Sequence, residues 1–168
     1  LHSTEASVQL GQRSSIQGKQ VQIQGKTGMQ INGGIEADTV AMVTETGDVQ
    51  IKTAEGIQAR TQIWVESKGG NVDSDSDLTA GELVAIQGQA VTLEAGHITA
   101  KQVQVNAKDR LNLGSDITAS AVVGESGKGL HVTAGTLASE QVKLHSTEAS
   151  VQLGQRSSIQ GKQVQIQG

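Results

Sequence analysis

Three acidic residues, Asp73, Asp75 and Asp77, have the D-x-D-x-D spacing with which the calcium loop of an EF-hand begins. In that loop, alternate carboxylates converge on one Ca²⁺ ion, a glycine makes the sharp turn, and a bidentate glutamate closes the site. Here Leu78 stands at the glycine position and Val84 at the glutamate position. We therefore expect a solvated acidic turn with no metal, and keep a weak Ca²⁺ site at these three aspartates as the alternative. No other segment suggests a metal or a cofactor.

Trp64 is the only aromatic residue of the chain. It stands between Ile63 and Val65, so its ring points outward if these two side chains point inward from a strand. The corresponding outward positions of the neighbouring repeats are the small residues Ala41 and Ala85, which leave room for the ring on the sheet. We interpret Trp64 as a cover that strengthens the sheet. The functional alternative is a surface contact point, such as a platform on which a sugar ring stacks.

The remaining side chains that could bind a metal or take part in catalysis are scattered along the sequence. His2, His131 and His145 are expected on outward strand positions and His97 in a turn, and no two have the spacing of metal ligands. An enzyme acting on acidic polysaccharides is the alternative to a structural role. Such an enzyme needs a carboxylate cluster in a cleft built by long loops. The near-uniform repeat leaves no room for such loops, so we expect no enzymatic activity and no catalytic residues.

Composition excludes several classes of function. The net charge is −4 and no basic patch is present, so nucleic acid is not expected as a partner. No apolar run is long enough to span a membrane. The chain has no Cys, which excludes a disulfide framework and a thiolate metal site. It also has no Pro, Phe or Tyr but 21 Gly, so its core must be built from aliphatic side chains.

Two repeats of different length organise the sequence. Residues 1–25 return unchanged as residues 144–168, which gives a long period of 143 residues. We interpret residues 1–168 as a single fragment of a longer tandem array. Within the long period, a motif returns every 19 to 22 residues, each time opened by one apolar residue: Ile16, Ile35, Ile57, Leu78, Ile98, Ile117, Leu137 and Ile159.

Each short repeat contains three segments in which apolar and polar residues alternate. Examples are Ile35-Glu36-Ala37, Val40-Ala41-Met42 and Val49-Gln50-Ile51. Alternation of period two predicts half-buried strands, here three short strands per turn separated by Gly- and Ser-containing turns. The predicted fold is an all-β parallel β-helix, a solenoid of about 20 residues per turn. Ser74 and Gly124 occupy slots that are otherwise apolar, and we expect the strand to end early at both.

The repeat resembles a known family. The unit I-x-A-x-x-V-x-I, a turn, then V-x-L resembles the haemagglutinin repeat of filamentous-haemagglutinin-like exoproteins, from Val8-Gln9-Leu10 to Val164-Gln165-Ile166. These are long secreted proteins of Gram-negative bacteria, and the group includes two-partner secretion adhesins and stalks of contact-dependent inhibition proteins. The resemblance implies that the parallel β-helix is right-handed, that the protein lies at the cell surface, and that a dedicated outer-membrane partner secretes it.

The expected function is a structural shaft that spaces a tip or effector region from the bacterial surface. Its contacts would then be the neighbouring repeats of the same chain. The alternative is a direct adhesin whose lateral face binds a host receptor, a glycan or a neighbouring fibre. Because the ends of a β-helix expose unpaired backbone groups, end-to-end self-association is a further expectation.

Overall fold

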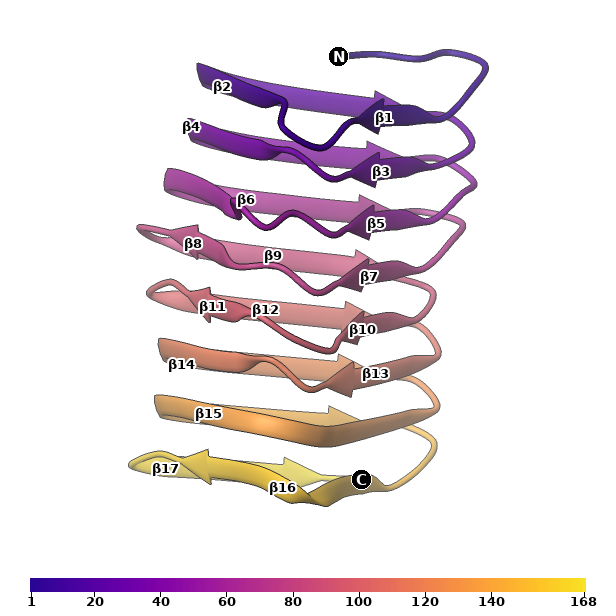
Figure 1. Ribbon diagram of the computed structural model, residues 1–168. Helices are drawn as coiled ribbons and strands as arrows, with labels where there is room; N and C mark the ends of the chain where they lie inside the picture. The colour runs from indigo at the N-terminus through magenta and orange to yellow at the C-terminus, as the bar shows by residue number, and fades with distance from the viewer.

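The chain is a β-solenoid in which inward apolar and outward polar residues alternate along nearly every strand. A computed structural model describes all of residues 1–168. The chain makes about eight turns of roughly 20 residues, stacked as layers in Figure 1. Every strand pairing is parallel and the fold contains no helix, so no helix crosses a membrane. The predicted fold class is confirmed.

The strands of successive layers form one continuous hydrogen-bonded sheet. Their bounds are β1 Val8–Leu10, β2 Ser15–Gly25, β3 Met29–Ile31, β4 Gly34–Thr44, β5 Val49–Ile51, β6 Ile57–Ser67, β7 Val72–Ser74, β8 Leu78–Ala80, β9 Leu83–Gly88, β10 Val91–Leu93, β11 His97–Thr99, β12 Gln102–Ala107, β13 Arg110–Leu113, β14 Asp116–Ser126, β15 Gly129–Ser146, β16 Val151–Gln160 and β17 Gln163–Gln167.

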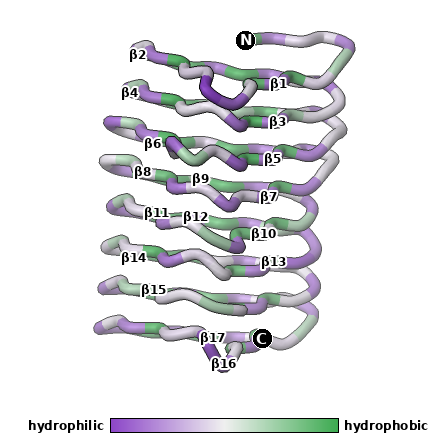
Figure 2. Tube along the Cα trace, in the orientation of Figure 1, coloured by the Kyte–Doolittle hydropathy of each residue, from purple (hydrophilic) through white to green (hydrophobic).

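Identical or similar apolar residues stack directly over one another in the interior. Ile35 pairs in register with Ile57, which pairs in turn with Leu78. Figure 2 shows the resulting alternation of hydrophobic and hydrophilic residues along the strands. Thirty-seven buried residues form a single core with no aromatic side chain. Each layer thus buries its apolar side chains against the layers above and below it, as expected of a solenoid.

The strands are longer than the sequence predicted. In β2, β4, β6 and β14 the first two predicted segments form one uninterrupted strand, and β15 joins all three segments. The parallel ladder continues through the corner, for example where Gly18 pairs with Ala37 and Gln20 with Thr39. A small residue at the corner lets the chain bend without losing its hydrogen bonds to the next layer.

The expectation that strands end early at Ser74 and Gly124 is wrong. Strand β7 ends at Ser74, at the same position where β5 ends at Ile51 and β10 at Leu93, and Ser74 points inward, 2 % exposed. Gly124 lies inside β14. A Cβ atom placed on Gly124 would meet Leu144 Cδ2 at 3.0 Å and Leu111 Cδ2 at 3.3 Å, so leucines of neighbouring layers fill the space. The ladder hydrogen bonds hold these two positions in the sheet regardless of the side chain.

A fourth inward column lies at the corner after the second segment of each turn. All its members are buried and small or hydroxylated: Gly25, Thr44, Ser67, Gly88, Ala107, Ser126 and Ser146. Thr44 Oγ1 and Ser67 Oγ both donate to the carbonyl of Gly47, at 2.6 and 2.8 Å. Thr44 thus binds the turn that follows it in its own layer, and Ser67 links its corner to the same turn of the preceding layer.

Candidate functional site

The acidic segment connects β7 to β8 through Asp75, Ser76 and Asp77, with a bend at Ser76. From Val72 to Ala80 the side chains nevertheless alternate inward and outward without a break. Asp73, Asp75 and Asp77 all occupy outward positions of this run. No group of three His, Cys, Asp or Glu side chains in the molecule could hold a metal ion.

The serines between these aspartates fasten the segment to the interior. Ser76 Oγ donates to the carbonyl of Ile51 at 3.1 Å and accepts the backbone N–H of Thr53 at 2.8 Å. Ser74 Oγ accepts the N–H of Ser76 at 3.4 Å. The D-x-D-x-D spacing is thus produced by ordinary strand alternation, with serine inside and aspartate outside.

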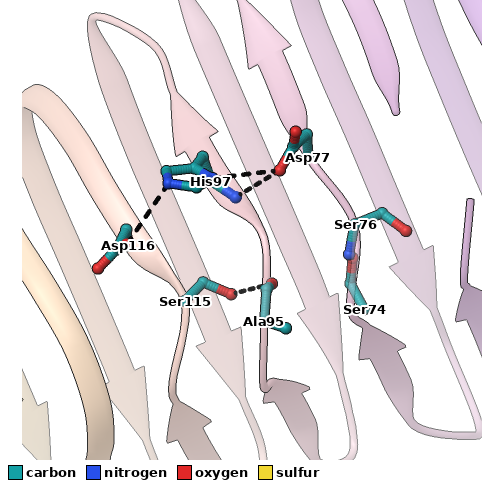
Figure 3. Close-up of polar contacts among 7 residues, drawn as sticks. All are labelled: Ser74, Ser76, Asp77, Ala95, His97, Ser115 and Asp116. Atoms are coloured by element: carbon teal, nitrogen blue, oxygen red, sulfur yellow. Dashed lines mark hydrogen bonds and ion pairs between the residues drawn. The ribbon is translucent and has the colours of Figure 1, made fainter. Parts of the chain in front are cut away.

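His97 joins two of the carboxylates across three layers, as Figure 3 shows. Its Nδ1 lies 3.4 Å from Asp77 Oδ1, and its Nε2 lies 3.5 Å from Asp116 Oδ2. Asp77 Oδ1 also accepts the backbone N–H of His97 at 2.8 Å, and Asp116 Oδ1 accepts that of Thr136 at the same distance. Ser115 Oγ donates to the carbonyl of Ala95 at 2.7 Å. The two aspartates therefore hold the next layer at this corner.

His97 corrects one expectation, because it begins strand β11 and does not lie in a turn. Its position just before the first inward residue of the layer makes it an exposed corner residue. His2, His131 and His145 occupy outward positions, as expected. His97 is therefore the histidine that lies between two carboxylates. Each of these, Asp77 and Asp116, also accepts a backbone N–H of the next layer.

Asp73 lies beside other acidic residues on the outer surface of β7. Partial burial, followed by the nearby carboxylate of Asp48, raises the pKa of Asp73 above its ordinary value, and Lys52 opposes the shift. Lys52 also lies 3.7 Å from Asp75. Partial burial is the larger cause and the nearby like charge the smaller one, and structural networks produce such shifts as readily as active sites do.

Trp64 points outward from β6, as predicted. It pairs in register with Ala41 on one side and with Ala85 on the other, and 37 % of its surface is exposed. Ala85 also occupies an outward position but is only 6 % exposed, so larger neighbouring side chains extend over it. The ring therefore sits between two small residues on an otherwise polar face.

A shallow depression of about 330 Å³ lies over the corners of β2, β4 and β6 and beside β8. Its charged groups are already paired: Arg60 Nε lies 3.4 Å from Asp38 Oδ1, and Gln17 Nε2 donates to Glu36 Oε2 at 3.3 Å. The lining residues are Gln17, Gly18, Glu36, Ala37, Asp38, Gln58, Ala59, Arg60 and Thr79. Arg60 and Asp38 compensate each other's charge, whereas Glu36 keeps its negative charge because Gln17 is neutral.

Charged surface residues pair between adjacent layers. Six Lys or Arg side chains lie within 4 Å of a carboxylate of the neighbouring turn: Lys52–Asp75, Arg60–Asp38, Lys101–Glu82, Lys128–Asp109, Lys143–Glu125 and Lys162–Glu140. Exposed pairs of this kind contribute little stability individually, about 0–1 kcal/mol. Sequence analysis missed them, although a separation close to one layer between opposite charges is their signal. Six carboxylates are thus engaged in ion pairs that connect adjacent layers.

No family model, no curated protein and no solved structure matches this chain.

Proposed function

We propose that the chain is a shaft segment of a large, secreted, cell-surface fibrous protein of a Gram-negative bacterium, with a spacer role and no enzymatic activity. One observation carries the proposal: layers of near-constant size stack in register, and the sequence of one layer returns unchanged after 143 residues. Repetition of this kind adds length, whereas a catalytic site is needed only once. At about 4.8 Å per layer, eight layers give roughly 35–40 Å of shaft.

Resemblance of the repeat to haemagglutinin repeats supports the cell-surface part of the proposal. On this view the chain is exported with an outer-membrane secretion partner, and its main contacts are the repeats before and after it. The alternative is a direct adhesin that binds a host receptor or glycan through Trp64, the one large exposed ring of the central layers. A polysaccharide-active enzyme is the least supported class, because no cluster of carboxylates in a deep cleft accompanies the near-uniform layers.

Binding and turnover assays on the 168-residue chain separate these functions. We expect no saturable binding to a glycan array or to host cells, and no degradation of acidic polysaccharides. The intrinsic fluorescence of Trp64, the only tryptophan, provides a direct titration signal. The matched variants are Trp64→Ala and Gln62→Ala, since Gln62 is another outward residue of β6.

The possible outcomes are distinct. Saturable binding that is lost in Trp64→Ala but retained in Gln62→Ala would replace the shaft with the direct adhesin. Release of oligosaccharides from a polysaccharide would overturn the non-enzymatic assignment. Unchanged Trp64 fluorescence in the unmodified chain and in Gln62→Ala, with no binding of any of the three proteins to the array or to cells, supports the shaft.

A further inference from the structure

Asn32 and Gly33 connect β3 to β4, and this is the one place in the chain where glycine follows asparagine. The main-chain nitrogen after an asparagine can attack the side-chain amide of that asparagine, and glycine hinders this attack least because it has no side chain. A Cβ atom at Gly33 would meet the carbonyl oxygens of Gly11 and Ser14 in the preceding layer. Close packing therefore keeps glycine at this position.

The N–H of Gly33 has no hydrogen-bond partner, unlike the corresponding groups of the next two layers. There the N–H of Thr53 donates to Ser76 Oγ at 2.8 Å, and that of Ser76 donates to Ser74 Oγ at 3.4 Å. By register, Thr53 Oγ1 is the hydroxyl that could bind Gly33, but it accepts the N–H of Glu55 at 3.2 Å. Gly33 is buried, and a buried N–H without a partner is unfavourable, so this connection opens more easily than a fully bonded one.

The side-chain amide of Asn32 is equally free. It makes no hydrogen bond, and Asn32 is only half-buried, so water reaches it. Asn71 differs, because its Oδ1 accepts the N–H of Ala90 at 3.1 Å and the backbone N–H that follows it donates to the carbonyl of Ala90 at 2.9 Å. The remaining asparagines lie inside strands that are paired on both sides: Asn106 in β12 and Asn112 in β13.

We propose that Asn32 is a site of spontaneous deamidation, with water as the only other reactant. The nitrogen of Gly33 gives up its proton and forms a bond to Cγ of Asn32, and the side-chain amide leaves as ammonia, so that a succinimide ring joins the two residues. Water then opens the ring. Breaking the new bond to Cγ gives aspartate at position 32, and breaking the original main-chain bond gives isoaspartate, which lengthens the backbone by a methylene.

The aspartate product fits the surface of the solenoid. Lys52 follows Asn32 in the next layer, and its N–H donates to the carbonyl of Ile31 at 2.8 Å. Lys52 Nζ in turn lies 3.7 Å from Asp75 Oδ2 in the layer after that. A carboxylate at position 32 would place an opposite charge beside Lys52 and extend this ion pair to three layers.

The isoaspartate product does not fit in the same way. Two hydrogen bonds to the preceding layer lie close to the site. The N–H of Asn32 donates to the carbonyl of Leu10 at 2.9 Å, and the N–H of Gly34 donates to that of Ser14 at 3.1 Å. An extra methylene between these bonds disrupts the ladder locally, as an inserted residue does in a bulge. We expect isoaspartate to loosen the connection between β3 and β4, whereas aspartate leaves it intact.

Ageing of the purified 168-residue chain tests the proposal, because each asparagine lies in a different tryptic peptide. The peptides are residues 27–52, 69–101, 102–108 and 111–128 for Asn32, Asn71, Asn106 and Asn112. The folded chain is incubated at physiological temperature, and mass spectrometry follows the gain of about 1 Da per deamidation. We expect conversion at least about tenfold faster at Asn32 than at the other three, because only there is the following N–H free. The rate should rise at alkaline pH, since the attacking nitrogen must lose its proton.

Two further samples isolate the contribution of the fold. The chain in urea gives the rate at Asn32 without structure, and Asn32→Gln keeps a side-chain amide but should show no conversion in residues 27–52. We expect the folded rate at Asn32 to lie within about tenfold of the rate in urea, because the fold leaves both reacting groups free. A larger retardation by folding, or conversion at Asn32 no faster than at Asn71, would overturn the proposal.

Asn32→Asp provides the reference for the aspartate product. This variant should unfold at the same temperature as the unmodified chain or at a higher one, and an aged chain rich in isoaspartate should unfold at a lower one. The reverse order would contradict the effects assigned to the two products. The site depends on neither the shaft nor the adhesin function.

Discussion

Residues 8–25 and 151–168 share one sequence but differ in structure. In the first copy the chain forms β1, turns through Gly11–Ser14 and resumes as β2. In the second copy the same residues form β16 without interruption as far as Gln160 (Figure 1). The adjacent layer accounts for the difference. Strand β15 pairs with Arg156, Ser157 and Ser158, whereas no strand of the structure pairs with the corresponding side of Arg13 and Ser14.

The turn in the first copy has a conformation that the second copy does not need. Arg13 is the one non-glycine residue with a positive φ, 62°, and Ser14 Oγ donates to the carbonyl of Gly11. Where a parallel neighbour offers a ladder of hydrogen bonds, the backbone becomes strand instead. The sequence of a layer therefore permits two local structures, and the covering layer selects one.

The largest difference between the two copies is expected at their inward apolar residues. Ile23 is fully buried, so Ile23→Ala should cost about 2–5 kcal/mol through lost burial and a cavity. Ile166 is 42 % exposed, so Ile166→Ala should cost about 1 kcal/mol. Urea unfolding of the two variants and the unmodified chain measures the ratio. Equal losses would show that Ile166 is as well covered in solution as Ile23.

Much of the fold follows from the sequence, because alternation and repeat length together determine which residues face inward. Trp64 between Ile63 and Val65 is an example, since its outward direction and its two alanine neighbours were both predictable. The stacked outward threonines Thr79 and Thr99 also pair as the repeat length requires.

Strand ends were not predictable in the same way. A serine or glycine in an apolar slot suggests a break when one strand is considered alone, but Ser74 and Gly124 remain in strands because both neighbours pair with them. His97 and the aspartates beside it likewise depend on contacts between layers. The acidic spacing at Asp73 left a Ca²⁺ site open as the alternative to a solvated turn, because sequence spacing alone does not show how far apart the carboxylates lie.

A substitution at the turn should have opposite effects in the two copies. Arg13→Gly removes the cost of a positive φ from a side-chain-bearing residue and should stabilise the chain by up to about 1 kcal/mol. Arg156→Gly places glycine inside β16 and should destabilise it by roughly 0.5–1 kcal/mol. Thermal unfolding at matched concentration provides the comparison. A loss of stability in both variants would mean that residues 11–14 are strand in both copies.

The smallest effect concerns an ion pair that only the second copy has. Hydrogen bonding to Lys162, followed by its charge, lowers the pKa of Glu140, and the same bond raises the pKa of Lys162. Lys19, at the corresponding place in the first copy, has no carboxylate within 4 Å. The pair therefore favours the folded last layer above the ordinary 4.5 of Glu140 and below the ordinary 10.5 of Lys162.

This stabilisation should be lost as the pH falls through the lowered pKa of Glu140 or rises through the raised pKa of Lys162. Glu140→Gln should remove it at every pH, with a slight increase in hydrogen exchange of residues 163–167 at neutral pH and low salt. Residues 20–24 provide the internal control and should not change. Because both side chains are exposed, the difference should also disappear at high salt. A salt-independent increase would show that Glu140 acts on the last layer through its packing. An equal increase at residues 20–24 would show that the substitution loosens the whole chain and not the last layer alone.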